Sequence, residues 1–195
     1  MGDVARNGHG PGKQPFLAMS VLSAGPMTSA DFRIAVQQHK DRVYTYAAWM
    51  LGDREEALDI AQETLMRLWK HRERVEASKA RAWLLWAAYR LCIDRLRHTA
   101  TQRGAVNRLM DLVQPTADDE ASRSLQRCEL RSTLAAALGT LSVRDRAIVL
   151  LREMDDLSYD EISETLGLPI GTLKAALHRA RERLRVALAQ SGVTT

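Results

Sequence analysis

The chain has 195 residues, of which 46% are hydrophobic, and its 28 Lys and Arg against 24 Asp and Glu give a net charge of +4. This size suits one folded domain or two small ones, and the mild positive charge permits a polyanionic partner without requiring one. No stretch approaches the roughly 18 uninterrupted apolar residues of a membrane span, so we expect no membrane insertion. Cys92 and Cys128 have no His or Cys neighbour at a metal-ligand spacing, which predicts free thiols, a cytoplasmic location, and no bound metal or cofactor.

Residues 1–27 are rich in Gly and Pro, which predicts a disordered N-terminal tail. Met27 is also placed to serve as the translation start, and the sequence alone does not decide whether residues 1–26 are translated. Thr28 or Ser29 is suited to cap the helix that follows, with Asp31 in its first turn.

Residues 28–100 follow a helical period that is broken at Gly52 and by a short connection at residues 76–79. This pattern predicts a compact bundle of three helices. The second helix of the bundle has one apolar stripe, formed by Ala57, Ile60, Ala61, Thr64, Leu65 and Leu68.

Residues 101–124 lose this period and contain the acidic, turn-rich run PTADDE, which predicts a flexible linker and the main domain boundary. Residues 125–190 are helical again. Ser142 is expected to cap one helix and Ser158 the next, with Glu161 at the capping-box position. No strand pattern occurs, so the sequence predicts an all-α fold of two small helical domains joined by the linker.

Residues 159–166, the turn 167–169 and the helix from Ile170 onward have the layout of a helix-turn-helix. Gly167 permits the left-handed turn. The second helix carries Lys174, Arg179, Arg181, Arg183 and Arg185 against Glu182. Five phosphate contacts would give a slope of about −4 to −5 in log K against log salt concentration. A solvated face on a core helix explains the charges alone, but the turn, the caps and the apolar pattern together favour a DNA-reading helix.

Two further signals lie in the first bundle. Residues 52–69 form an acidic patch beside the apolar stripe. DNA repels such a surface, so it suits a protein partner with basic groups, although a plain solvated acidic face fits the spacing equally well. Residues 90–108 are rich in Arg and follow Trp83, Trp86 and Tyr89, a combination that suits single-stranded DNA. For Trp83 the favoured interpretation is burial in the core.

Three strings together resemble the bacterial extracytoplasmic-function (ECF) sigma factors, over about residues 31–188. EEALDIAQETLMRLW resembles region 2.2, which docks on the β′ clamp helices of RNA polymerase. RAWLLWAAYRLCIDRLR resembles regions 2.3 and 2.4, which open and read the −10 element. LSVRDRAIVLLREMDDLSYDEISETLGLPIGTLKAALHRARERL resembles region 4, which reads the −35 element.

The resemblance implies an alternative sigma factor that binds core RNA polymerase, through the β′ clamp helices and the β flap, and promoter DNA, under the control of an anti-sigma factor. It assigns polymerase binding to Glu56, Asp59, Gln62 and Glu63. It assigns −10 binding to Arg81, Trp83, Tyr89, Arg90, Arg95 and Arg97. It assigns −35 binding to Gly171, Thr172, Lys174, Ala175, His178, Arg179 and Arg181.

The chain departs from the family at two places. Arg90 stands where the family usually has an Asn that holds a flipped-out base, and a guanidinium cannot reproduce the donor and acceptor pair of an amide. Ala175 and Ala176 stand where Ser-Arg is frequent, and their methyl groups are suited to contact thymine methyls. The promoter consensus therefore does not carry over from relatives.

No catalytic constellation is evident, and His39, His71 and His98 lack spaced partners and are expected to face solvent. We therefore expect that the protein is not an enzyme. Two alternatives remain open at this point: a helix-turn-helix regulator that does not replace sigma, and a helical protein that binds other proteins only.

Overall fold

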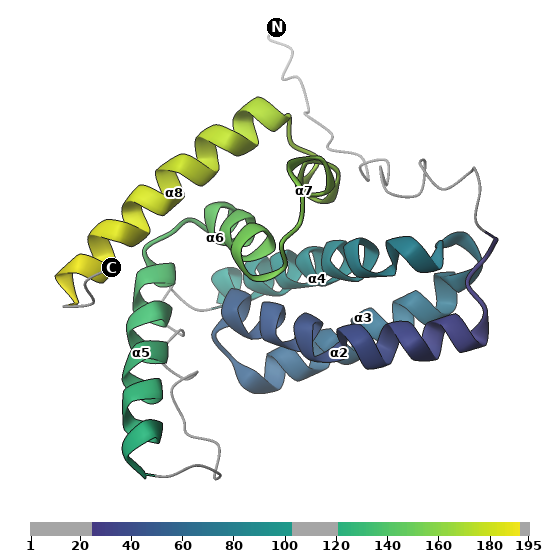
Figure 1. Cartoon of the computed structure of the whole chain (residues 1–195), viewed down its shortest axis with the longest axis horizontal. Coiled ribbons are helices and arrows are strands. Elements are labelled where there is room, and N and C mark those ends of the chain that lie inside the picture. Colours follow the sequence, from purple (N-terminus) through teal and green to yellow (C-terminus); the bar gives the residue numbers. More distant parts are fainter. Residues whose placement is uncertain (1–24, 103–120, 192–195) are drawn as a thin grey trace, which may run out of the picture.

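The computed structural model describes residues 25–102 and 121–191, and every regular element within these ranges is a helix. Helices α2 to α4 form an N-terminal bundle, and α5 to α8 form a C-terminal unit that packs on it through α6 and α7 (Figure 1). The predicted all-α fold is confirmed. The predicted linker lies mostly outside the described residues, as does the predicted tail. No helix in the described part of the chain is long and apolar enough to span a bilayer.

The first helix, α2 (Ser29–Leu51), begins with the predicted cap. The Thr28 hydroxyl accepts the Asp31 N–H at 3.2 Å, and the Asp31 carboxylate accepts the Thr28 N–H at 2.9 Å. The packed region starts one residue earlier than predicted, because Met27 is 3% exposed and its N–H donates to the Arg72 carbonyl at 3.1 Å. Met27 therefore belongs to the bundle rather than to the tail.

Two short breaks separate the three helices of the bundle. Gly52 adopts a left-handed φ of 73°, and Asp53 then caps α3 (Arg54–His71) by accepting the Glu56 N–H at 2.9 Å. The predicted apolar stripe of α3 is buried apart from Leu65, which is half-buried. The predicted connection at residues 76–79 contains the 3-10 turn η2 (Ala77–Lys79) and leads into α4 (Ala80–Gln102), but the break begins earlier than predicted, with a second 3-10 turn, η1 (Arg72–Arg74).

The C-terminal unit consists of α5 (Ala121–Gly139), α6 (Val143–Val149), a π-helical turn η4 (Leu150–Met154), α7 (Tyr159–Leu166) and α8 (Ile170–Gln190). Helix α5 begins inside the predicted linker. The caps predicted at Ser142 and Ser158 are confirmed, including the capping box with Glu161, and Gly167 ends α7 at a left-handed φ of 66°.

The junction of α7 and α8 is one part of the core of this unit, to which α5 and α6 also contribute. Ile162 is fully buried on α7, and Leu173 and Leu177 on α8 are at most 2% exposed. At about 25 cal/mol per Å² of buried apolar surface, each of these side chains contributes about 2 kcal/mol to stability. Their burial fixes α7 against α8 and confirms the predicted helix-turn-helix packing.

A polar seam joins the two units, and it is formed mainly by three arginines. Arg42 of α2 places Nε 2.9 Å from Oδ1 of Asp155, close enough for an ion pair although the angle does not make a hydrogen bond. Arg81 of α4 donates to the Asp155 carbonyl at 3.3 Å and to the Glu161 carboxylate at 3.4 Å. Arg146 of α6 is 8% exposed and crosses to α2.

The histidines correct one prediction. His98 is exposed as expected, but His71 is half-buried, with its ring 6.0 Å from that of Trp83. His39 is also half-buried, and its Nδ1 has no hydrogen-bond partner in the described structure. Burial, together with the nearby charges of Arg81 and Arg42, lowers the pKa of His39.

Cys92 is a free thiol, as predicted. It is fully buried in the hydrophobic core, and burial raises the pKa of Cys92 to about 12. The thiol is therefore protonated at neutral pH and poorly nucleophilic.

Candidate functional site

Helix α8 presents one side to solvent along the edge of the molecule (Figure 1). All the residues predicted to read the −35 element are exposed: Gly171, Thr172, Lys174, Ala175, His178, Arg179 and Arg181. The opposite side of α8 is buried against α7 and α6. The turn at residues 167–169 therefore aims a continuous exposed surface outward, which is the placement that a recognition helix needs.

The predicted contribution of the two alanines needs a correction. Ala175 is exposed, but Ala176 is only 3% exposed, because it lies on the same side of α8 as Leu173 and Leu177. Only the Ala175 methyl group is therefore available to a thymine.

Three of the five basic side chains on α8 are paired with carboxylates. Arg181 lies 2.6 Å from Glu153, Arg185 lies 3.2 Å from Glu182, and Arg183 lies 3.8 Å from Asp145. Neither Lys174 nor Arg179 has a carboxylate within ion-pair distance among the described residues. Exposed pairs of this kind contribute about 0–1 kcal/mol, so DNA phosphates can replace the carboxylates as partners of these arginines. Lys174 and Arg179 can bind a phosphate without first giving up a carboxylate.

A second surface is a pocket of about 140 Å³ between α3 and α4. Its lining combines cationic, aromatic and acidic side chains: Arg67, His71, Trp83, Trp86, Ala87, Arg90 and Asp94. The Trp83 and Trp86 rings lie 6.0 Å apart, and the Arg90 guanidinium lies 6.0 Å from the centre of the Trp86 ring. An aromatic wall beside guanidinium and carboxylate groups is suited to hold a planar, hydrogen-bonding ring.

The residues predicted for −10 binding do not all reach this pocket. Arg90 and Trp83 line it, but Trp83 is 3% exposed and packs in the core, as the sequence favoured, so it supports the wall without offering a free ring face. Arg81 instead belongs to the seam. Arg95 pairs with Glu56 at 3.7 Å.

The other two predicted −10 residues, Tyr89 and Arg97, are also on α4 but do not line the pocket. Arg97 is exposed and lies 3.9 Å from Asp94. Tyr89 is half-buried, and burial raises the pKa of its hydroxyl. Arg67 and His71 also line the pocket but were not predicted as site residues, because they come from α3 and only folding brings them to α4. Trp86 lines it too, and the sequence had marked it among the aromatic residues suited to single-stranded DNA.

The third surface is the outer side of α3. Of the residues predicted to bind polymerase, Asp59 and Gln62 are exposed, whereas Glu56 and Glu63 are partly buried and paired, Glu63 with Arg67 at 2.8 Å. The exposed acidic and amide groups alternate with large apolar side chains that the sequence prediction did not include. These are Leu58, Met66 and Trp69, which are 51%, 51% and 41% exposed.

The spacing of Leu58, Gln62, Met66 and Trp69 is that of a single helical face. We call this face, together with Asp59, the α3 stripe. The sequence does contain a sign of the α3 stripe, because Leu58, Met66 and Trp69 are apolar but do not belong to the predicted buried stripe of this helix.

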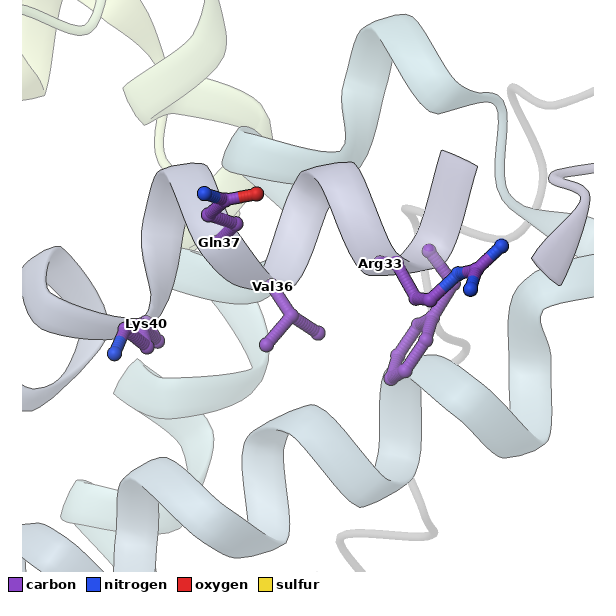
Figure 2. A pocket seen from close by; sticks show the side chains of 5 residues that line it. Arg33, Val36, Gln37 and Lys40 are labelled. Carbon is purple, nitrogen blue, oxygen red and sulfur yellow. The ribbon is translucent and has the colours of Figure 1, made fainter. Parts of the chain in front are cut away.

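The α3 stripe continues onto α2. The Phe32 and Trp69 rings meet at 5.0 Å in an edge-to-face contact, and the Arg72 guanidinium stacks 4.2 Å from the Trp69 ring centre. A shallow pocket follows on α2, lined by Phe32 with the side chains labelled in Figure 2, which are Arg33, Val36, Gln37 and Lys40. The exposed surface of α2 is therefore basic where that of α3 is acidic and apolar.

An exposed basic helix behind a short turn, on one of two helical units, defines a helix-turn-helix nucleic-acid-binding protein. Residues 35–102 match the family model of Sigma-70 region 2, and residues 131–184 match that of Sigma-70, region 4. The chain is 34% identical over 178 residues to the ECF RNA polymerase sigma factor SigL of Mycobacterium tuberculosis, covering 89% of this chain and 98% of that protein. The chain therefore belongs to the ECF RNA polymerase sigma factors, which are transcription initiation factors.

The chain is also similar to other ECF sigma factors. SigW of Bacillus subtilis, also an ECF sigma factor, is 33% identical over 165 residues, which cover 79% of this chain and 87% of SigW. SigE of Mycolicibacterium smegmatis is 34% identical over 161 residues, and there the match covers 82% of this chain but only 62% of the relative.

Solved structures show the same fold. The sigma factor RpoE of Bartonella quintana, in complex with the anti-sigma factor NepR, superposes with a TM-score of 0.64 at 22% identity, over 82% of this chain and 97% of that one. CnrH, in complex with the cytosolic domain of CnrY, superposes with a TM-score of 0.59 at 21% identity, over 82% of this chain and 88% of that one.

Proposed function

We propose that the chain is an alternative sigma factor that binds core RNA polymerase and directs it to promoters through their −10 and −35 elements. In this proposal α8 reads the −35 element, the pocket between α3 and α4 captures a −10 base, and the α3 stripe docks on the polymerase. The observation that carries the proposal is that the helix-turn-helix and the α3 stripe are exposed at the same time on different units.

For the −35 element, α8 enters the major groove with its first three turns. Arg179 and Lys174 supply phosphate or base-edge contacts, and Thr172 and Ala175 lie on the same exposed side. Phosphate contacts fix the register, whereas base-edge contacts and groove shape carry the sequence information.

For the −10 element, the pocket between α3 and α4 receives a base that has left the duplex. Trp86 offers a ring to stack on, at about 1–3 kcal/mol per stacked base, and Arg90 with Asp94 offers donors and an acceptor. Capture of the unpaired base offsets the free energy of unpairing, so binding to the open form melts the DNA.

The described arrangement is a closed one, and promoter binding requires it to open. The two elements are centred about 25 base pairs apart, which is about 85 Å at about 3.4 Å per base pair. Helix α8, with 21 residues, is about 31 Å long, and α7 lies directly against α4 through the bond from Arg81 to Glu161. Residues 103–120 span at most about 60 Å when fully extended. Together with the lengths of the helices on either side, this reach is enough for the two units to bind elements about 85 Å apart.

Several further expectations follow from the family. The β′ clamp helices would receive the α3 stripe, and the β flap would receive the C-terminal unit. An anti-sigma factor would hold the free chain, as the anti-sigma factor NepR is bound to the sigma factor RpoE in one of the solved complexes. We assign no catalytic step to this chain, since polymerase carries out the chemistry, and we place it in the cytoplasm with polymerase.

The test is transcription in vitro with purified core polymerase that contains no other sigma factor. Promoter templates come from mapping transcript starts after overexpression of the chain. We expect specific starts only when the chain is added. If starts appear only when another sigma factor is also present, the chain is a helix-turn-helix regulator and the proposal is wrong.

A further inference from the structure

Two cations lie near the ring of Tyr159, close to the start of the recognition helix. The Arg152 guanidinium lies 5.1 Å from the ring centre, and Nζ of Lys174 lies 5.5 Å from it. Both distances are within the range at which a cation is attracted to an aromatic face. Tyr159 is the first residue of α7, Arg152 belongs to η4 and Lys174 to α8, so one ring connects three elements of the helix-turn-helix unit.

This ring is held in place from several sides. Ser158 and Glu161 close a capping box around the first turn of α7, which fixes the backbone of Tyr159. The ring is half-buried against the core. Arg152 is itself anchored, because it donates to the Leu157 carbonyl at 2.7 Å. The ring is therefore a fixed support, whereas Lys174 is an exposed side chain on a flexible four-carbon stem.

We infer that Tyr159 is a positioning residue for DNA recognition: its ring holds the ammonium of Lys174 in the orientation in which that ammonium meets the −35 DNA. The inference rests on the proposed function. An ammonium has three donors, and its contact with a ring face leaves donors free to reach a phosphate or a base edge. Pre-ordering the lysine reduces the side-chain entropy that is lost when DNA binds.

The π-helical turn η4 supports this assignment because it also orders a second cation of α8. Arg152 and Glu153 are neighbours on η4, and Glu153 holds Arg181 of α8 through two hydrogen bonds, at 3.0 and 2.6 Å. The same turn thus orders two cations of α8, Lys174 through the Tyr159 ring and Arg181 directly. π-helical turns inside helices occur frequently at functional sites.

The test measures holoenzyme binding to promoter duplexes that the wild-type holoenzyme selects from a random-sequence pool. Tyr159→Leu removes the ring and keeps an apolar side chain, and Tyr159→Phe keeps the ring. Both are made in the wild-type chain and in Lys174→Ala. We expect Tyr159→Leu to weaken binding by about threefold to tenfold in the wild-type background, to leave the salt slope unchanged, and to have no further effect in Lys174→Ala. Tyr159→Phe should bind like wild type.

A variant with trifluorinated phenylalanine at position 159 separates the loss of the cation–ring attraction from a folding defect. Fluorine withdraws electron density from the ring face but changes the shape of the ring little. It should weaken binding relative to Tyr159→Phe while the thermal midpoint stays constant. Equal losses for Tyr159→Leu in both backgrounds, or tighter binding, would overturn the inference while the proposed function stands. If the wild-type holoenzyme enriches no −35 element, the proposed function fails and the inference fails with it.

Discussion

The stability of the protein should depend on pH in part through one buried carboxyl in the seam, that of Asp155. Its side chain is 1% exposed. It faces Arg42 of α2 and Arg81 of α4, with the Tyr46 hydroxyl also nearby and Asp156 next in the chain. Burial raises the pKa of Asp155 from 3.8 to about 6, against the opposing effect of the two arginines and with a small addition from Asp156.

The sign and size of the effect follow from this shift. A raised pKa means that the folded state binds the proton more tightly than the unfolded state, so Asp155 stabilises the fold as pH falls and this contribution is lost as pH rises through about 6. With pKa values of about 6 folded and 3.8 unfolded, the contribution is about 1.4 kcal/mol at pH about 5 and close to zero at pH about 7.5.

The assay is urea denaturation of wild type and Asp155→Asn across this pH range. The free energy of unfolding of wild type, minus that of Asp155→Asn, should be about 1.4 kcal/mol larger at the lower pH. Subtraction removes the titration of other groups, including His39, whose lowered pKa acts in the opposite direction. Asp156→Asn is the matched control, because that side chain is exposed, and its difference should change much less with pH, since it removes only the small contribution of Asp156 to the raised pKa of Asp155. A constant difference for Asp155→Asn would refute the assignment of this titration to Asp155.

Three other predictions concern the exposed surfaces. Lys174→Ala with Arg179→Ala should weaken binding to the −35 duplex and reduce the steepness of the salt dependence by about 2, as measured by salt titration; an unchanged slope would mean that neither cation meets a phosphate. Asp59→Arg should weaken binding to core polymerase by about tenfold or more while the circular dichroism spectrum stays the same, and unchanged affinity would move the docking surface away from the α3 stripe. Arg90→Asn should change the base preferred at one −10 position when promoters are selected from a random pool, whereas an identical selected sequence would remove Arg90 from −10 recognition.

The sequence predicted well those features that depend on neighbours in the chain. Thr28 and Ser158 cap their helices, and Gly167 ends α7 in a left-handed conformation. Each of these features depends only on residues within about four positions in the chain, so each can be predicted from the sequence. The recognition helix was predictable for the same reason. Its exposed side follows from the spacing of Leu173 and Leu177.

The rest depends on contacts between distant residues. Arg81 was assigned to −10 binding through the resemblance of its sequence string to regions 2.3 and 2.4, but its hydrogen-bond partners are 74 and 80 positions away in sequence. The pairing of Arg95 with Glu56 also required α3 and α4 to be packed. The pattern of charges on one helix cannot show which of its arginines another helix will engage.

Arg146 shows how differently the contacts of the seam respond to mutation. It donates from Nε to the Leu138 carbonyl at 3.2 Å and from an amino group to the Met50 carbonyl at 3.0 Å, close to the C-terminal ends of α5 and α2. Both acceptors are main-chain oxygens, which every amino acid supplies. Side-chain changes at positions 50 and 138 therefore leave the acceptors in place, whereas one codon change at position 146 removes both bonds. Genetic variation that loosens this contact should for that reason be found at the arginine itself and not on the helices it ties together.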